Sequence, residues 1–350
     1  MNDDLKNQIS NLSLQELENV KTLVNTLLDT KANKKQTNIE FLQENKIIVC
    51  PKNRDHRIKR NGLKNGIQRF WCHGCKHGFS LTNNSITNSS SISYSQIKTL
   101  LKCMYDYKSV KEIAFETGLH KTSVFELEIR IFDALEQVSN NLKLKEVVQI
   151  DEKYIRTSFK GTRAKNMPRP SRYNGNSDLI SGISEDQVCI VVAIDTYDTI
   201  IIKVVGNGNA STDMISKALK NKIEEGSVIV TDCKNSYEKF AENNKLKLIQ
   251  IPSKKHKIDD YTINDVNEIM NEIEIYLKQK RGISTRHLQH HMNFIRYKKI
   301  IKYTIEYMEI NKKMYIDAIT LKTRIKSNDV YSTEQPIDID DYKKWYEQHH

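Results

Sequence analysis

The sequence predicts an α/β protein whose mixed-sheet core follows two small basic modules. Three observations predict it: a cysteine pair among short β-like runs at residues 46–82, a helix-turn-helix pattern within residues 92–140, and apolar runs ending in acids from residue 146 onwards. The 350 residues are enough for several domains and at least one sizeable core. We therefore divide the chain into an N-terminal helix (1–38), the two modules, a core domain (146–300) and a C-terminal extension of unknown role (301–350).

Composition and charge narrow the classes of function. Lys and Arg number 55 against 44 Asp and Glu, a formal net charge of +11. No run approaches about 20 apolar residues, which excludes a transmembrane helix, and the polar N-terminus lacks the features of a signal peptide. Six cysteines are too few for a disulfide framework. We expect a cytoplasmic protein without a membrane partner, whose positive charge serves nucleic acid.

The first segment, 1–38, has the signals of an amphipathic helix. Ser13 and Glu16 have the spacing of a capping box, and apolar residues follow at helical intervals up to Leu28. Two roles remain open for this helix, packing on its own chain and self-association.

Residues 46–82 have the chemistry of β-hairpins. β-like runs at residues 46–49 and 68–71 flank two Asn-Gly pairs, at 61–62 and 65–66, which are typical hairpin turns. The strand that carries Arg69 and Trp71 is basic and aromatic, which suits contact with a phosphate backbone.

The cysteines of this module form an incomplete zinc pattern. Cys72 and Cys75 make a C-x2-C pair, half of a structural zinc site. Upstream, Cys50 is present but Asn53 stands where a second cysteine is expected, so His56 is the candidate fourth ligand. Either Zn²⁺ binds through Cys50, His56, Cys72 and Cys75, or the module has lost its metal and keeps only the hairpin shape. His73 and His77 are weaker candidates.

Residues 92–140 are predicted to be helical, with a helix-turn-helix at residues 108–125. Ile113 lies on the predicted buried face of the first helix, Gly118 takes the tight turn, and Val124 faces inward from the second helix. A plain helical hairpin is the alternative. The residues expected to face DNA are His120, Lys121 and Ser123.

From residue 146 the pattern changes to strands. Residues 147–152 form an apolar run that reaches Asp151, and residues 227–232 form a second that ends in Asp232. Between them we expect an antiparallel pair (188–195 and 199–205) and a helix (211–225). Acids at the carboxyl ends of two core strands meet at one sheet edge, where they provide the oxygen ligands that Mg²⁺ prefers. Such a site supports attack on a phosphodiester.

The order of these segments, with "QIDEKYI", "VIVTDCKNSY", "YTINDVNEI" and "RGISTRHLQHHMNFI", resembles the DDE-type transposases of bacterial insertion sequences that carry an N-terminal zinc ribbon. The likeness covers about residues 47–299. It implies a ribonuclease-H-like catalytic core that uses two Mg²⁺ or Mn²⁺ ions, with Asp151 and Asp232 as the first and second ligands. It also implies terminal inverted repeats and target DNA as partners, a homodimer or higher oligomer, and association with the nucleoid when DNA is bound.

The third ligand of the resemblance has two candidates. The phrase Asn264-Asp-Val-Asn267 matches the family's pattern and makes Asn267 the third position, while Glu268 is the neighbouring acid. The family often has Lys seven residues after this position, where this chain has Glu274. Lys278 and Arg281 lie on the same predicted helix face and would supply the positive charge instead.

A basic segment, residues 156–172, follows the first acid. Its cations, including Lys160, Arg163 and Lys165, would grip DNA phosphates if the segment is a mobile loop beside the active site, and a disordered linker is the alternative. The competing functions are a non-catalytic DNA-binding protein, either a regulator or a decayed transposase, and a structure-specific nuclease on the same fold.

Overall fold

A computed structural model describes most of the chain. The described residues are 12–13, 15–21, 48, 50, 52–53, 55–64, 67–80, 85–86, 92–138, 142–163, 166–171, 182–252, 255 and 257–349. Residues 15–21 are helical and begin with the expected capping box, in which the Glu16 carboxylate accepts hydrogen bonds from the Ser13 backbone N–H (2.9 Å) and hydroxyl (2.7 Å). The rest of the predicted N-terminal helix and the β-like run at 46–49, apart from residue 48, lie outside the described residues.

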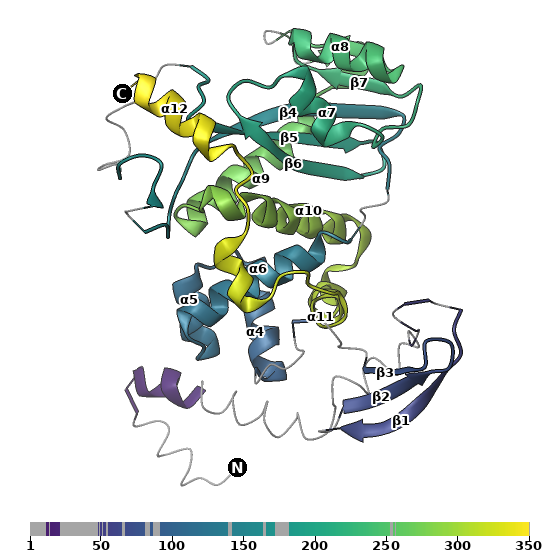
Figure 1. Ribbon diagram of the computed structural model, residues 1–350, viewed down its shortest axis with the longest axis vertical. Helices are drawn as coiled ribbons and strands as arrows, with labels where there is room; N and C mark the ends of the chain where they lie inside the picture. The colour runs from purple at the N-terminus through teal and green to yellow at the C-terminus, as the bar shows by residue number, and fades with distance from the viewer. Residues whose placement is uncertain are drawn as a thin grey trace.

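The cysteine-bearing module is a three-stranded antiparallel sheet set apart from the main body (Figure 1). Its strands are β1 (Ile58–Lys64), β2 (Ile67–Cys72) and β3 (His77–Ser80). The expected turn at Asn61-Gly62 is wrong, because both residues lie inside β1. The register shifts between Arg60 and Leu63, and Gly62 takes a φ of 69° there, so this Asn-Gly pair forms an irregularity within the strand.

Three helices follow, α4 (Tyr94–Tyr105), α5 (Val110–Thr117) and α6 (Lys121–Leu135). Capping boxes begin α4 at Ser93 and α5 at Ser109. Gly118 ends α5 with a φ of 67°, a conformation that glycine adopts without steric cost. A three-residue turn, Gly118 to His120, joins α5 to α6, and the two helices contact each other.

The core domain is built on a five-stranded mixed sheet with the order β6-β5-β4-β7-β8. Only β5 runs opposite to the others, since β4 and β6 flank it antiparallel while β7 and β8 continue parallel to β4. This is the ribonuclease-H-like arrangement, which confirms the predicted fold class. The strand bounds are β4 (Val147–Arg156), β5 (Gln187–Asp195), β6 (Ile200–Asn207), β7 (Val228–Thr231) and β8 (Lys247–Gln250).

Helices cover both faces of this sheet (Figure 1). One face packs on α7 (Thr212–Leu219) and α8 (Asn235–Asn244), and the other packs on α9 (Asn264–Lys280) and α10 (Leu288–Thr304). A small hairpin, β9 (Lys257–Ile258) and β10 (Tyr261–Thr262), leads into α9. The expected helix at 211–225 is too long: it ends at Leu219, and Asn221 adopts a positive φ of 61° that interrupts the helical backbone.

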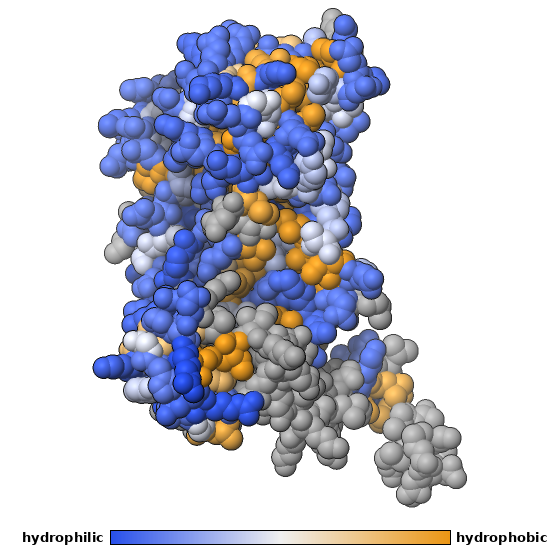
Figure 2. All heavy atoms as spheres, turned by 90° about the vertical axis from the view of Figure 1, so that its right-hand side faces the viewer, coloured by the Kyte–Doolittle hydropathy of each residue, from blue (hydrophilic) through white to orange (hydrophobic). Residues whose placement is uncertain are grey.

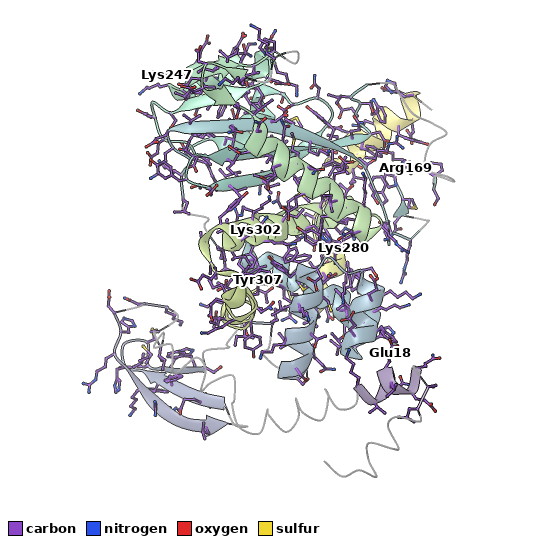
Figure 3. All side chains as sticks on the ribbon, turned by 180° about the vertical axis from the view of Figure 1, so that it is seen from behind. Glu18, Arg169, Lys247, Lys280, Lys302 and Tyr307 are labelled. Carbon is purple, nitrogen blue, oxygen red and sulfur yellow. The ribbon has the colours of Figure 1, made fainter. Side chains whose placement is uncertain are left out.

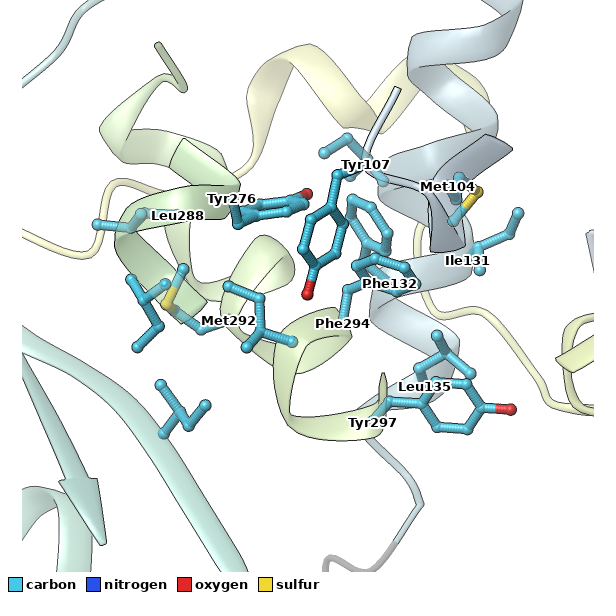
Figure 4. Close-up of a cluster of buried hydrophobic side chains, with 14 of the residues drawn as sticks. Met104, Tyr107, Ile131, Phe132, Leu135, Tyr276, Leu288, Met292, Phe294 and Tyr297 are labelled. Carbon is cyan, nitrogen blue, oxygen red and sulfur yellow. The ribbon is translucent and has the colours of Figure 1, made fainter. Parts of the chain in front are cut away.

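The face that carries α9 and α10 shares one hydrophobic core with α4, α5 and α6. Figure 4 shows the centre of this core, where Tyr107, in the turn after α4, and Phe132 of α6 meet Tyr276 of α9 and Phe294 of α10. Tyr107 lies edge-on to Tyr276, with ring centroids 4.8 Å apart. Because aromatic pairs of this kind are among the larger contributors to core packing, the helical module and the sheet domain are held as one body here.

The C-terminal extension packs back onto both parts. α11 (Ile310–Thr320) contacts α4 and α6, and a 3-10 helix (Ser327–Ser332) lies on α6. The chain ends in α12 (Ile339–His349). The buried Tyr342 hydroxyl donates to Asp186 (2.8 Å), which fixes α12 beside the sheet domain.

Hydrophilic residues dominate the face shown in Figure 2. None of the helices in the described part of the chain combines the length and apolar character that crossing a membrane requires.

Candidate active site

The register of the sheet brings Asp151 and Asp232 together. β4 and β7 pair in parallel, with Gln149 opposite Val230, so two residues further along Asp151 is level with Asp232. Asp232 follows the last residue of β7, as expected. Asp151 does not end its strand, because β4 continues to Arg156 through its hairpin with β5. The acids therefore meet where β7 ends beside the middle of β4.

A third carboxylate joins them. One carboxylate oxygen from each of Asp151, Glu152 and Asp232 lies within 4.8 Å of the others. Successive side chains of a strand point to opposite faces, and Glu152 accordingly turns toward α8, where it is buried. Glu152 was not among the residues expected in the site.

Glu152 is held by two partners from the start of α8. Tyr237, itself buried, donates its hydroxyl to Glu152 Oε1 at 2.7 Å, and the Lys234 ammonium bonds Glu152 Oε2. The same ammonium lies 3.4 Å from Asp232 Oδ2, so it touches two of the three carboxylates. Although burial disfavours the charged ammonium, Glu152 and Asp232 raise the pKa of Lys234, so this side chain stays charged. The signal that could have found Lys234 is its position two residues after Asp232.

The electrostatics of the three acids suit a cation. Burial raises the pKa of Asp151 to about 6, and the neighbouring Glu152 and Asp232 charges act in the same direction. Asp232 Oδ1 is buried and has no hydrogen-bond partner among the described residues. An orphaned carboxylate oxygen beside two further carboxylates is the donor set that a hard divalent ion prefers, so the residues fit Mg²⁺ or Mn²⁺.

Helix α9 lies along β4 and spans the position of Asp151. At one side the Gln149 amide donates to Asp265 (2.6 Å) and accepts from the backbone of α9, and at the other Lys153 pairs with Glu274 (2.9 Å). Asn267 and Glu274 are seven residues apart, nearly two helical turns, and thus share the face that meets β4.

Glu268 points elsewhere. Its carboxylate pairs with the buried Lys299 of α10 at 2.6 Å, and Glu268 is outside the carboxylate group. Helix phase therefore puts Asn267 on the same side of α9 as Glu274, which pairs with Lys153 of β4, and turns Glu268 toward α10.

The cations further along α9 differ in their surroundings. Lys278 is exposed and pairs with Glu274 at 2.8 Å. Lys278 and Lys153 together lower the pKa of Glu274 to about 2, so this acid remains ionised. Arg281 ends α9 in the left-handed conformation, with a φ of 52°.

The zinc pattern also gathers in space. The ligand atoms of Cys50, His56, Cys72 and Cys75 all lie within 4.8 Å of one another. His56 Nδ1 is 3.2 Å from Cys75 Sγ and 3.5 Å from Cys72 Sγ, and the Cys50 and Cys75 sulfurs are 3.6 Å apart. Ligands of a tetrahedral zinc ion with bonds of about 2.0–2.3 Å lie roughly 3.3–3.8 Å apart, so the donor set fits Zn²⁺.

Two further features favour a metal at this place. A Cβ on Gly74 would lie 2.6 Å from His56 Cγ, so the knuckle accommodates the imidazole only with glycine there. Although burial opposes it, backbone hydrogen bonds at Lys52 and Asn53 lower the pKa of Cys50, whereas burial raises the pKa of Cys75, so Cys50 is the thiol of this pair that loses its proton first. A thiolate is the form that binds zinc.

Of the residues expected to contact DNA, Arg69 and Trp71 share one face of β2, opposite the buried Phe70. His120 is the N-cap of α6 and accepts from the Thr122 backbone N–H (3.3 Å). His120 and Lys121 are exposed and Ser123 is half-buried, whereas most of α6 beyond this first turn is buried.

The basic segment after β4 is not uniformly available. Lys160 and Arg163 are exposed, and Lys165 and Arg172 lie outside the described residues. Arg169 is buried: it donates to the Tyr342 hydroxyl (3.0 Å) and the Thr157 carbonyl (3.2 Å), as its position beside α12 in Figure 3 reflects. Arg169 therefore belongs to the packing of α12, and the view of the whole segment as a phosphate-gripping loop is wrong at this residue.

Comparison with known proteins identifies the domain that carries the three acids. Residues 143–299 match the family model of the ISXO2-like transposase domain. No curated protein sequence matches the chain.

Solved structures that align with the chain include a pre-cleavage Mos1 transpososome (10% identity, 65% of this chain and 79% of that one, TM-score 0.26) and the Mos1 strand transfer complex (12%, 63% and 74%, 0.28). A Mos1 mariner paired end complex with Mn aligns similarly (12%, 65% and 79%, 0.26). TM-scores this low support no conclusion about the fold or function of this chain.

Proposed function

Residues 143–299 form a DDE-type transposase domain of the ISXO2-like family, and from this premise we propose that the protein moves a bacterial insertion sequence. It binds the terminal inverted repeats of its element, hydrolyses a phosphodiester bond at each end and joins the freed 3′-hydroxyl to target DNA.

The observation that carries this proposal is the convergence of Asp151 and Asp232. A DNA-binding protein without catalysis has no need for these carboxylates to meet, and a separation of more than about 8 Å would disfavour metals that sit about 3.5–4 Å apart. Their oxygens instead lie within 4.8 Å, with one oxygen of Asp232 buried and unpartnered among the described residues.

The chain's own residues divide the work of the site. Asp151 and Asp232 would hold divalent ions, with the side-chain carbonyl of Asn267 as third ligand. Ions bound there supply Lewis-acid activation of the attacking oxygen and charge neutralisation at the leaving oxygen. Tyr237 and Lys234 hold Glu152 in place behind the two aspartates. The Lys234 ammonium, which also touches Asp232, adds positive charge where the scissile phosphate would lie.

The remaining modules would hold the DNA. The exposed first turn of α6 (His120, Lys121 and Ser123) enters the major groove, since recognition helices read bases with their N-terminal residues. Arg69 and Trp71 of the zinc-bearing module contact the backbone, and Lys160 and Arg163 add phosphate contacts nearer the active site. Transposition pairs two element ends, so a homodimer or higher oligomer is part of the proposal.

The test is cleavage and strand transfer on a duplex that carries the inverted repeats flanking the coding sequence. With Mg²⁺ or Mn²⁺ present, the wild type should cut, and Asp151→Asn and Asp232→Asn should bind the duplex but not cut it. Asn267→Ala should be impaired, whereas Glu268→Gln, which changes a neighbouring carboxylate turned toward α10, should cut normally.

Two results would decide against the proposal. Equal activity of the wild type and both aspartate variants would remove the catalytic assignment. Specific binding without cleavage by the wild type would instead identify a non-catalytic DNA-binding protein.

A further inference from the structure

A cavity of about 460 Å³ lies between the helix-turn-helix and the transposase domain. Its walls come from the start of α5, from α6, from the loop after β4 and from the segment that follows α9. The last two walls are tied together, because Lys160 Nζ donates to the carbonyls of Arg281 (3.2 Å) and Gly282 (3.0 Å). The proposed catalytic residues Asp151, Asp232 and Asn267 do not line it, and of its lining residues the proposed function uses only Lys160, for a phosphate contact.

The inner wall is aromatic and has an unsatisfied polar atom. Phe125 packs edge-on to His287, with ring centroids 5.3 Å apart, and lies against Tyr331 at 6.0 Å. His287 is only 5% exposed, and its Nδ1 has no hydrogen-bond partner among the described residues. Burial lowers the pKa of His287 to about 4, so the ring is neutral at pH 7 and offers one donor and one acceptor. Because His287 lines the cavity, its buried and unpaired ring nitrogen favours a ligand with polar edges.

The rim of the cavity is cationic. Four of its residues are Lys111, Lys160, Arg281 and Arg286, and no carboxylate forms an ion pair with them in the described part of the chain. The acid that lines the floor, Glu128, is already neutralised by the buried Lys280 at 2.7 Å, which Figure 3 labels between α9 and the first helices. The rim therefore has an excess of positive charge, which complements phosphate.

We propose that this cavity receives one nucleotide, with the base against Phe125 and His287 and the phosphate on the cationic rim. Stacking on aromatic side chains and pairing with Arg or Lys is the usual way in which proteins hold an unpaired nucleotide. The volume is within the range of about 300–1,000 Å³ that is typical of small-molecule sites. A flat polar ring satisfies the orphaned His287 nitrogen, which an aliphatic ligand would leave unpaired.

The nucleotide comes from a DNA strand in this proposal, which to that extent rests on the proposed function. The cavity touches the α5–α6 pair on one side, and on the other it touches Lys160, nine residues after Asp151 on the chain. A strand that leaves the helix-turn-helix toward the active site would pass this opening. A free mononucleotide has the same chemistry and is the second source to be tested.

The experiment measures binding by the full-length protein without added divalent metal, so that cleavage plays no part. One arm follows the fluorescence polarisation of a short labelled single-stranded oligodeoxyadenylate, and the other follows deoxyadenosine monophosphate by calorimetry. Thr162→Trp fills the cavity without changing charge, and His287→Phe keeps the ring but removes its nitrogens. Arg281→Asn removes a rim charge and keeps a residue that tolerates positive φ.

Lys245→Asn is the matched control for the rim variant. Lys245 ends α8 with a φ of 54°, as Arg281 ends α9 with 52°, and it is exposed and remote from the cavity lining. The two substitutions therefore remove the same charge from the same backbone conformation.

We expect Thr162→Trp to weaken oligonucleotide binding about tenfold, the size of one lost stacked base, and His287→Phe to weaken it less. Arg281→Asn should weaken it and reduce the slope of log affinity against log salt by about 1, while Lys245→Asn should leave both unchanged. If the monophosphate binds as tightly as the oligonucleotide and is lost in Thr162→Trp, the source is a free nucleotide.

The proposal is overturned if Thr162→Trp and Arg281→Asn, folded by circular dichroism, bind both probes as the wild type does. This outcome is distinct from a failure of the transposase proposal. If the wild type cuts element ends while these variants bind both probes as the wild type does, only the nucleotide cavity is refuted.

Discussion

Lys234 occupies the place that a divalent ion would share, and replacing it should tighten metal binding while weakening the fold. Its ammonium bonds Glu152 and lies 3.4 Å from Asp232 Oδ2. An ion held by Asp232 at about 2.1 Å would have this cation roughly 4 Å away. At that distance a double charge and a single charge repel by about 2 kcal/mol even at the dielectric of water. Lys234→Met should therefore raise Mn²⁺ affinity about thirtyfold.

The same substitution leaves Glu152 without its cation. The Glu152 side chain is fully buried, and removal of one partner from a buried pair costs about 3–5 kcal/mol. We expect the lower end of this range, because the Lys234 side chain is 28% exposed and Tyr237 still donates to the carboxylate. Glu152→Gln combined with Lys234→Met removes both charges and should recover part of the loss.

The assay pairs calorimetric titration with Mn²⁺ and urea unfolding, each with and without the ion. Lys239→Met is the control, since it makes the same change at an exposed position on the same helix and should alter neither quantity. Mn²⁺ should restore more stability to Lys234→Met than to the wild type. If the variant binds Mn²⁺ no more tightly than the wild type does, Lys234 does not compete with the ion and the carboxylates are not its site.

Two more predictions concern the zinc cluster and the buried histidines. Cys72→Ser should lose the zinc that metal analysis finds in the wild type, whereas Asn53→Ala should keep it, because His56 completes the ligand set; zinc loss in both would contradict that set. His287 has its folded pKa lowered to about 4, below the ordinary value of about 6.5, so the unfolded state binds more protons between these values and stability falls as pH falls through this window. From pH 7 to pH 5 this loss is about 2 kcal/mol for His287 alone, and urea unfolding of His287→Phe should show a pH dependence smaller by that amount; an unchanged dependence would mean that His287 is not held neutral by burial.

The strands β4 to β7 could be predicted because they contain apolar runs, whereas β8, whose side chains are exposed or half-buried, was not predicted. The expected antiparallel pair at 188–195 and 199–205 agrees within two residues with β5 and β6. The sequence indicates that these strands exist more clearly than it indicates where each strand ends. The apolar run of β4 is broken by Asp151, Glu152 and Lys153, so the sequence does not mark its continuation to Arg156, which depends on pairing with β5. The C-terminal helix α12 was missed because its stability comes from long-range contacts of Tyr342, which local sequence does not encode.

The acids of the site were predictable for a related reason. Asp151 and Asp232 each follow a buried run, and parallel pairing of the two runs brings them level. Glu152 was passed over because residues adjacent on a strand point to opposite faces, so the sequence alone suggests that only one of two neighbours reaches a site. The structure turns Glu152 inward toward Tyr237, a contact between positions 85 residues apart.

The phase of helix α9 is what favours Asn267 over Glu268 as the proposed third ligand. By charge alone Glu268 is the better ligand, and by sequence the two positions differ by a single residue. A step of one residue turns a helical side chain by about 100°, and α9 has no freedom to absorb that turn, since Gln149 holds its first turn and Lys153 holds Glu274 further along. Lys299 then takes the Glu268 carboxylate on the far side. On our proposal that the neutral Asn267 is the third ligand, Glu152 supplies the negative charge that a third acid would bring. The Lys234 ammonium bonds Glu152 and lies 3.4 Å from Asp232 Oδ2, so it reduces the repulsion among the carboxylates.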